Sequence, residues 1–222
     1  MLLTDTIRKS TAAIERQRSM REDKEAADNY AKALKQLSQV INTLQSTVDC
    51  VIQMQSSGIV MHPILTQKTR DELNELINNC GMSIYEYNLT TDLVTAFKTK
   101  VEAFSSEVTI TWKNTALHYS EGPKGYLSMI GGLTDNPSYA QNLAIEIDKA
   151  VNNSPSSTTI RKLVSAVGEA NKITDSFALS PDIESFLKKV ASQHATVSDL
   201  SPDIIRWLEK KKLKDKLRVK FK

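Results

Sequence analysis

Three histidines are the residues best suited to metal or acid–base chemistry, and they stand far apart. His62, His118 and His194 belong to no HExxH motif and to no closely spaced pair. A zinc site needs at least three converging N, S or O ligands, and Cys50 and Cys80 are thirty residues apart. This spacing predicts surface or partly packed histidines, reduced cysteines in or near the core, and no metal or cofactor.

Other motifs that could support catalysis are equally incomplete. Residues 122–125, GPKG, lack the GxxxxGK[ST] pattern of a phosphate loop, and their proline removes one amide that would bind phosphate. The carboxylate pairs Glu146/Asp148 and Asp182/Glu184 are two residues apart, which places the two acids on different faces of a helix. These patterns argue against an enzyme, although a site assembled in space from distant residues stays open.

The composition indicates an ordinary globular chain built from long helices. Hydrophobic residues make up 40% and charged residues 25%, with only seven glycines and six prolines in 222 residues. Many short strands would need more turn residues than this. The start of the chain lacks the basic and apolar regions of a signal peptide, and no window approaches the roughly 18 apolar residues of a membrane span. We therefore expect a cytoplasmic, soluble protein with no membrane contact.

The clearest periodicity lies near the N-terminus. Apolar residues alternate there at steps of four and three over three heptads, which places them on one stripe of a helix: Tyr30, Leu34, Leu37, Ile41, Leu44, Val48 and Val51. We predict one helix from about residue 4 to about residue 55, ended by Ser56-Ser57-Gly58. At 1.5 Å per residue it extends about 75 Å, more than a domain of this size can cover.

The stripe allows two interpretations. It is either a core helix that packs within its own chain or a coiled-coil seam that binds a protein partner or a second copy of the chain. Its length and polar flanks favour the partner, whereas Tyr30 and the polar Gln55, which continues the seam, argue against a long, strong zipper.

Further helices follow from apolar spacing and from helix-ending residues. Residues 108–112, VTITW, alternate and are β-branched, so a short strand is the alternative to helix there. Residues 121–138 hold four of the seven glycines and predict a loop. The expected helices cover residues 67–80 with Gly81 as the stop, a segment that starts near Thr90 or Thr91 and continues through 108–112, and residues 137–151 and 158–177.

A short internal repeat predicts two helix starts near the C-terminus. Residues 179–183, LSPDI, recur as residues 200–204. Serine accepts hydrogen bonds from free amides at a helix start, proline suits the first helical position, and aspartate interacts favourably with the helix dipole. Each helix should then bury an Ile, an aromatic residue and a Leu at spacing i, i+3, i+4.

The last residues carry most of the positive charge. Residues 206–222, the basic tail, hold nine Lys or Arg and two acids, a net charge of +7. The whole chain has a net charge of +3, so the first 205 residues have a net charge of −4. Val219 and Phe221 alternate with basic residues, as in a short edge strand or an extended docking peptide. The tail is either a solvated end or a site for an acidic protein or a nucleic acid, through Lys210, Lys211, Lys212, Lys214, Lys216, Arg218 and Lys220.

Residues 183–221, with IESFLKKV followed by ATVSDLSPDIIRWLEKKKLKDKLRVKF, resemble the C-terminal ends of small helical accessory proteins. Such proteins occur in bacterial operons that encode ATPases or nucleases, including anti-phage defence operons. The resemblance covers about 40 of the 222 residues and includes no catalytic motif. It implies a non-catalytic subunit that acts through a larger partner.

Together these patterns predict an all-α protein in three segments. Residues 1–56 form the long helix, 57–178 a bundle of shorter helices, and 179–222 a capped helix pair with the basic tail, including at most one short strand. The expected function is that of a non-enzymatic assembly subunit of a bacterial multi-protein complex, with antiviral defence as one setting. The alternative is a nucleic-acid-binding accessory protein that acts through the tail.

Overall fold

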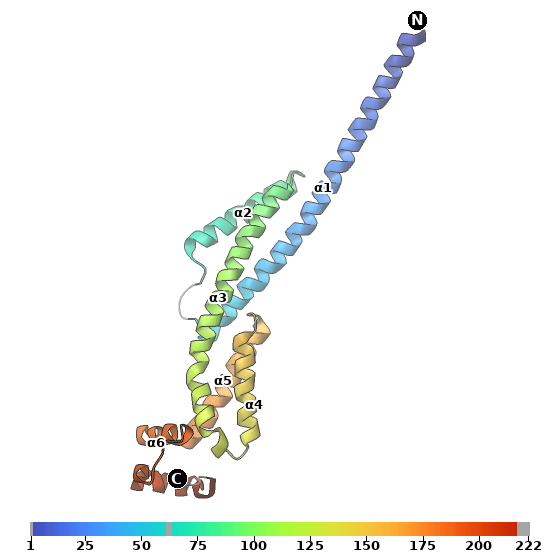
Figure 1. Ribbon diagram of the computed structural model, residues 1–222. Coiled ribbons are helices and arrows are strands. Elements are labelled where there is room, and N and C mark those ends of the chain that lie inside the picture. Colours follow the sequence, from blue (N-terminus) through green and yellow to red (C-terminus); the bar gives the residue numbers. More distant parts are fainter. Residues whose placement is uncertain (1, 61–63, 217–222) are drawn as a thin grey trace. The chain divides into compact units, whose positions relative to one another are not determined.

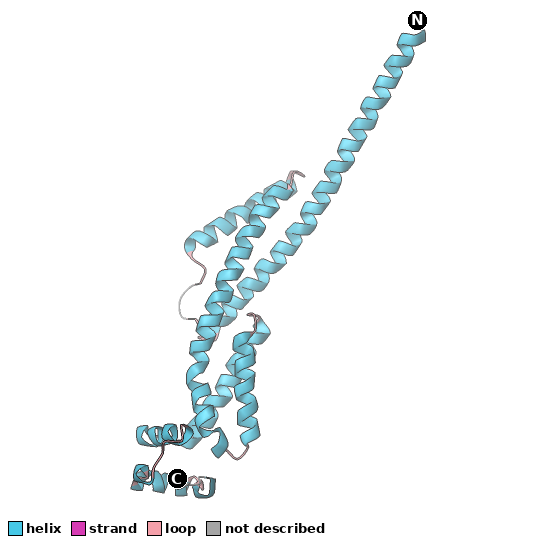
Figure 2. Cartoon of the chain, in the orientation of Figure 1, coloured by secondary structure: helices cyan, strands magenta, loops and turns pink. Residues whose placement is uncertain are grey.

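The structure is a computed structural model that describes residues 2–60 and 64–216, with side chains from residue 15 onward. Every regular element in these ranges is a helix, which confirms the all-α prediction (Figure 2). The helix expected over residues 108–112 is confirmed as well. Val219 and Phe221, for which the sequence suggested a short edge strand or an extended docking peptide, lie outside the described residues.

The chain forms two compact units, and each combines two distant segments. Unit 1 comprises residues 1–48 and 63–107, and unit 2 comprises residues 49–62 and 108–222. Neither expected segment end, after residue 56 or after residue 178, separates the two units. The reason is that two long helices contribute to both units: α1 (Leu2–Ser56) and α3 (Thr91–Ile130).

Unit 1 is built from three helices: parts of α1 and α3, and the whole of α2 (Gln67–Tyr85). In Figure 1, α2 runs antiparallel to α1 and α3. Its core is aliphatic and aromatic, because one face of each helix supplies apolar residues at helical spacing: Ala33, Leu37, Val40, Leu73, Cys80, Val94, Phe97, Val101 and Phe104.

The end of α1 is the one expected from Ser56-Ser57-Gly58. The amide of Gly58 donates to Gln55 O and the amide of Ile59 donates to Met54 O, both at 3.1 Å. These two bonds form a Schellman motif, which needs a left-handed residue, and Gly58 has φ +70°. Because glycine has no Cβ, it adopts this conformation at low cost.

Two predicted helix ends are wrong, because tertiary packing outweighs local propensity. Helix α2 continues through Gly81 to Tyr85, and its added turn brings Ile84 O to the Tyr30 hydroxyl at 3.3 Å. Helix α3 continues through the expected loop to Ile130 with Pro123 inside it. A mid-helix proline costs about 3 kcal/mol, and the burial of Leu127 and Ile130 in this segment offsets that cost.

Unit 2 contains shorter helices that follow α3: η1 (Gly131–Leu133), α4 (Pro137–Asn152), α5 (Ser157–Phe177), α6 (Pro181–Ala191), η2 (Val197–Asp199), α7 (Pro202–Lys210) and η3 (Lys214–Lys216). Near the start of the part of α3 that belongs to this unit, Trp112 is fully buried and donates from Nε1 to Asn153 O at 3.0 Å. This bond joins α3 to the connection between α4 and α5.

The repeated LSPDI segments start α6 and α7 as predicted. Ser180 Oγ accepts from the amide of Ile183 at 3.4 Å, and Ser201 Oγ accepts from the amide of Ile204 at 3.3 Å. Proline follows each serine at the first helical position. Both expected apolar triads are buried in one C-terminal core: Ile183, Phe186 and Leu187 from α6, and Ile204, Trp207 and Leu208 from α7.

Candidate interaction surfaces

The predicted seam of α1 is divided between core and surface. Leu37 and Val51 are buried, and Tyr30, Leu44 and Val48 are half-buried. Leu34 and Ile41 instead expose 36% and 47% of their surface. The buried line of α1 includes residues one position earlier than the predicted ones: Ala33, Val40 and Thr47 in place of Leu34, Ile41 and Val48. The apolar stripe of α1 is therefore wider than the face of α1 that packs into the core.

Two contacts and a cleft show how the helices of unit 1 surround their core. Tyr30 on α1 bonds the carbonyl of Ile84 on α2. Lys100 on α3 pairs with Glu72 on α2 at 2.8 Å. A cleft of about 370 Å³ between α1 and α3 is lined by Val40, Val101 and polar residues that include Gln39 and Thr43. Each helix therefore lies beside the other two.

Aliphatic residues on α1 and α2 stay half-exposed outside this core. On α1, Leu34 and Ile41 lie about 140° or more around the helix from Gln39 and Thr43, on the flank turned away from α3. On α2, Ile77 and Ile84 lie about 120° to 140° from Glu72, which marks the side that meets α3. Both pairs of residues therefore lie on flanks that turn away from α3.

We call these four residues, Leu34, Ile41, Ile77 and Ile84, the α1/α2 edge. Their exposed fractions are 36%, 47%, 42% and 38%. On each of the two helices, half-exposed aliphatic residues therefore recur at a spacing of seven residues. The edge includes two members of the predicted seam and two residues of α2 that sequence reasoning missed. Ile77 could have been found, because it is an apolar residue four positions after Leu73 in the helix expected over residues 67–80.

Tyrosines border one end of the α1/α2 edge. The rings of Tyr30 and Tyr87 have centroids 6.2 Å apart, within the range of favourable aromatic pairs. Tyr85 and Tyr87 are each 83% exposed. Exposed tyrosines are frequent in protein interfaces, because each supplies a large apolar ring and a polar hydroxyl.

The N-terminal part of α1 is exposed on every side. All residues from Glu15 to Asn29 are exposed, and in Figure 1 this part of α1 runs past the ends of α2 and α3 in unit 1. We call residues 15–29 the arm. Arg18 Nε donates to Glu22 at 2.9 Å, an i,i+4 pair of a kind that stabilises a helix by about 0.2–0.5 kcal/mol. Such a contribution is small compared with the tertiary packing that holds most helices of folded proteins.

Most described cations of the basic tail already bond groups of this chain. Lys216 Nζ donates to Leu133 O at 2.9 Å and to Thr134 O at 2.8 Å, and Lys211 Nζ donates to Ser176 O at 2.6 Å. Lys214 pairs with Glu209, and Arg206 pairs with Asp203. Among residues 206–216, Lys210 and Lys212 are the cations without a bond to the described chain. Arg218 and Lys220 lie outside the described residues.

Leu213 in the tail belongs to the protein's own core. It is 3% exposed, and its amide donates to Leu208 O at 2.8 Å. The amide of Lys212 donates to Glu209 O, and Lys212 adopts φ +56°, so α7 ends in a Schellman motif. That motif commonly brings the residue after the left-handed position into apolar contact with the last turn, and here both Leu213 and Leu208 are buried.

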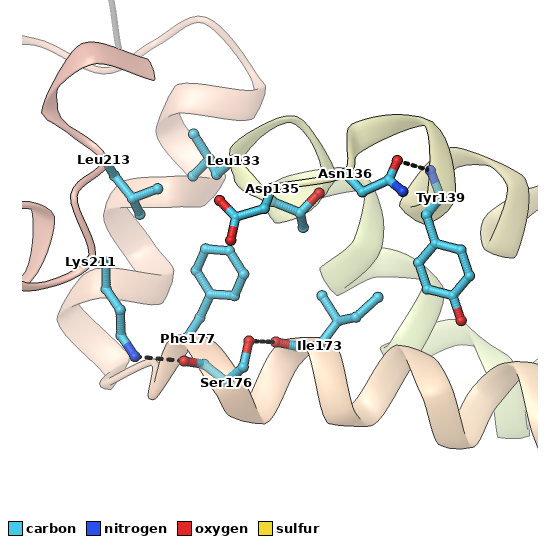
Figure 3. A pocket seen from close by; sticks show the side chains of 10 residues that line it. Leu133, Asp135, Asn136, Tyr139, Ile173, Ser176, Phe177, Lys211 and Leu213 are labelled. Carbon is cyan, nitrogen blue, oxygen red and sulfur yellow. Dashed lines mark hydrogen bonds between the residues drawn. The ribbon is translucent and has the colours of Figure 1, made fainter.

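Figure 3 shows the cleft that the tail helps to form in unit 2. It has a volume of about 320 Å³ and a mixed lining of apolar and polar side chains. Its polar groups mostly serve the fold: Asn136 caps α4 by accepting from the amide of Tyr139 at 3.0 Å, and Lys211 bonds the end of α5. The residues around it include Leu133, Asp135, Ile173, Phe177 and Leu213.

The remaining candidates from the sequence lie apart. His118 and His194 are exposed, and His62 lies outside the described residues. In the part of the chain that the structure describes, no group of three His, Cys, Asp or Glu could hold a metal ion. The GPKG segment lies inside α3, and its Lys124 pairs with Asp148 at 2.5 Å.

Both cysteines are buried and free, as expected. Burial raises the pKa of the Cys80 thiol. Burial also raises the pKa of Cys50, the nearby charge of Asp49 adds to the effect, and a hydrogen bond with the backbone of Ser157 opposes it. A raised pKa favours the thiol over the reactive thiolate, so both residues are suited to packing.

Comparison with known proteins yields no relative: no family model, curated protein or solved structure matches the chain. Within the described residues, no helix combines the length and the apolar character that crossing a membrane requires.

Proposed function

We propose that this protein is a non-enzymatic assembly subunit that acts by binding other proteins through unit 1. The observation that carries the proposal is the arm, in which every residue from 15 to 29 is exposed on one continuous helix. Isolated helices are marginally stable in water, because most helical stability in proteins comes from packing. A partner surface along the arm would supply the packing that the rest of unit 1 does not provide.

The sequence of the arm suits a polar interface. It holds Arg16, Arg18 and Arg21 before an acidic stretch from residue 22 to residue 28, and its few apolar residues include Met20 at 74% exposed. A helix that is polar all round bridges between domains, depends on its own i,i+4 pairs, or is not stable by itself. The resemblance of residues 183–221 to accessory subunits of bacterial operons supports the same role.

Removal of residues 1–28 tests this function. Because residues 15–28 are exposed, the shortened chain should keep the thermal transition of the remaining helices, measured by circular dichroism. The full chain, purified under native conditions from its own organism, should elute in a complex larger than 24.8 kDa. The shortened chain should elute as the monomer. Identical elution of both chains would contradict the proposal.

A further inference from the structure

The arm carries its positive and negative charges in two separate stretches. Residues 16–21, RQRSMR, hold three arginines and no acid, a net charge of +3. Residues 22–28, EDKEAAD, hold four acids and one lysine, a net charge of −3. All of these residues are exposed, and an ion pair joins Arg18 to Glu22. An exposed pair of this kind is weak, so both stretches can attract a partner of opposite charge.

A second copy of the arm in antiparallel orientation has the matching distribution of charge. Most oligomers of identical chains are symmetric, and two-fold symmetry brings the same surface of both copies together. A two-fold axis beside residue 22 sets Arg16 of one copy level with Asp28 of the other, and Arg21 level with Asp23. The basic stretch of each copy then lies beside the acidic stretch of the other. A parallel pair instead sets every charge level with its own copy, and like charges repel.

The same arrangement brings apolar sequence beside the exposed side of the α1 stripe. Because α1 is one continuous helix, an axis beside residue 22 sets residues 2–14 of one copy level with residues 30–42 of the other. Residues 30–42 include Leu34 and Ile41, which expose 36% and 47% of their surface. Residues 2–14 include four large aliphatic residues: Leu2, Leu3, Ile7 and Ile14. The overlap of the two helices then extends over about 60 Å, instead of about 20 Å for the arms alone.

The charges of these two outer stretches do not favour pairing. Residues 2–14 hold one acid and two basic residues, a net charge of +1, and residues 30–42 hold two lysines, a net charge of +2. The opposite charges of the arm therefore determine the orientation of the two helices, and the outer stretches contribute apolar surface.

We infer that the arm binds the arm of a second copy of this chain in an antiparallel pair, so that the protein assembles as a dimer. Arg16, Arg18 and Arg21 of each copy contact the acidic stretch, residues 22–28, of the other. This inference rests on the proposed role of the arm in assembly and names one partner for it. A larger complex then contains two copies of the chain.

The mass of the chain purified by itself tests this inference. Light scattering should give twice 24.8 kDa for the full chain and the mass of a monomer for a chain without residues 1–28. The dissociation constant of the dimer should rise severalfold as the salt concentration increases from about 0.05 M to about 0.5 M, because salt screens exposed charges. A full chain that stays monomeric by itself would overturn the inference.

An acidic arm should abolish the dimer. Arg16→Glu, Arg18→Glu and Arg21→Glu together make both stretches negative, so two copies repel each other and the variant should be a monomer. The matched control makes the same change of charge at three exposed lysines of unit 2 and should stay a dimer: Lys113→Glu, Lys149→Glu and Lys162→Glu. A dimeric acidic-arm variant, or a control as monomeric as that variant, would contradict pairing through the arm.

A basic arm should restore the dimer of the acidic one. Glu22→Lys, Asp23→Lys and Glu25→Lys together make both stretches positive, so this variant should also be a monomer by itself. An equal mixture of the two monomeric variants should form a dimer that contains one chain of each, because their arms then carry opposite charges. This result also shows that neither variant lost its fold. Two variants that stay monomeric in the mixture would refute the inference.

The orientation is tested by all six substitutions in one chain, which make the first stretch acidic and the second basic. In an antiparallel pair, this reversed chain binds itself, but beside the unchanged chain it sets like charges together. Native mass spectrometry of a mixture should therefore show two separate homodimers and at least about tenfold less mixed dimer. A mixed dimer in excess over both homodimers would indicate parallel pairing and contradict the inference.

A pair of apolar substitutions tests the outer stretches. Leu34→Gln with Ile41→Gln should raise the dissociation constant of the dimer severalfold, because these residues lie level with the apolar sequence of residues 2–14. Ile110→Gln with Leu117→Gln is the matched control, because these two residues also lie seven apart on one helix and are 62% and 60% exposed. A similar loss in the control would show that the effect does not arise beside the arm, and would count against the proposed overlap.

The source of the sample separates this inference from the proposed function. If the chain is a monomer by itself but elutes in a larger complex from its own organism, the arm binds a different protein. The proposed function then stands and the inference is wrong. If the native material has only the mass of two copies, the inference stands and the binding of other proteins is contradicted.

Discussion

In the C-terminal helices of unit 2, all three apolar residues of each repeated segment reach the core, whereas in unit 1 the apolar stripe of α1 is split. The helices α6 and α7 are short and capped by Ser180 and Ser201, and each triad has a width that one core can cover. Helix α1 presents a wider stripe, and the two neighbouring helices cover only part of it. The difference shows that apolar periodicity identifies a helix face, while the neighbouring helices determine which residues stay accessible.

The largest expected effect on stability distinguishes the buried side of the α1 stripe from its exposed side. Leu37→Asp places a charge in the core of unit 1 and should lower the free energy of unfolding by about 3–5 kcal/mol. Ile41→Asp, four residues away and 47% exposed, should lower it by less than about 1 kcal/mol. Urea denaturation followed by circular dichroism measures both. Equal losses would show that the whole stripe is internal, and the comparison between the units would fail.

The caps of unit 2 should contribute smaller amounts. Ser180→Ala and Ser201→Ala each remove the side-chain acceptor of one helix start, at a cost of about 1 kcal/mol. Ser192→Ala is a matched control, because its hydroxyl bonds Lys189 O at the end of α6 and caps no amide. Both cap variants should have a lower midpoint temperature of thermal unfolding than the control. A control as unstable as the cap variants would show that the serines act through something other than capping.

Some helix starts and ends in the two units follow from the local sequence, and others do not. The LSPDI segments predicted both helix starts and both buried triads, because a cap and its first turn interact over only a few residues. The end of α1 at Gly58 followed for the same reason. Gly81 and Pro123 misled the prediction, because glycine and proline report local preference while the burial of Cys80, Leu127 and Ile130 decides the structure.

The surfaces were less predictable than the helices. Tyr30 and Leu37 belong to one sequence stripe, but their different burial depends on where α2 and α3 pack. In the basic tail, the sequence shows the charge of Lys211 and Lys216 but not the carbonyls of Ser176 and Leu133 that they bond. Those carbonyls come from distant parts of the chain, so no pattern within the tail reveals them.

The basic tail allows unpaired lysines to be compared with a paired one. If it binds an acidic protein or a nucleic acid, Lys210→Gln with Lys212→Gln should weaken that binding severalfold, because these two lysines make no bond within the described chain. Lys214→Gln should change it less, because Lys214 already pairs with Glu209. A titration with a DNA duplex at two salt concentrations measures the effect. Steep weakening with salt would indicate phosphate contacts. Equal loss in both variants would show that pairing within the tail does not limit its charges.

The smallest expected effect concerns Asp199, which joins α6 to η2. The Lys189 side chain bonds its carboxylate, the Thr196 amide and hydroxyl add further bonds, and together they lower the pKa of Asp199 to about 2. Because the pKa is lower in the folded state, this carboxylate contributes stability above its unfolded pKa of about 3.9, and the contribution is lost as the pH falls toward 2. Carboxyl NMR shifts should show a low pKa that rises in Lys189→Met. An unchanged value in that variant would refute Lys189 as the main cause.

The mass of the native assembly shows whether unit 1 binds a partner protein. The unchanged chain, the Leu34→Gln/Ile41→Gln variant and the Ile110→Gln/Leu117→Gln control should each be purified from the native organism and measured by light scattering. We expect a complex above 24.8 kDa for the unchanged chain and the control, and partial or complete loss of partner mass for the edge variant. A monomeric unchanged chain, or one mass for all three proteins, would contradict it.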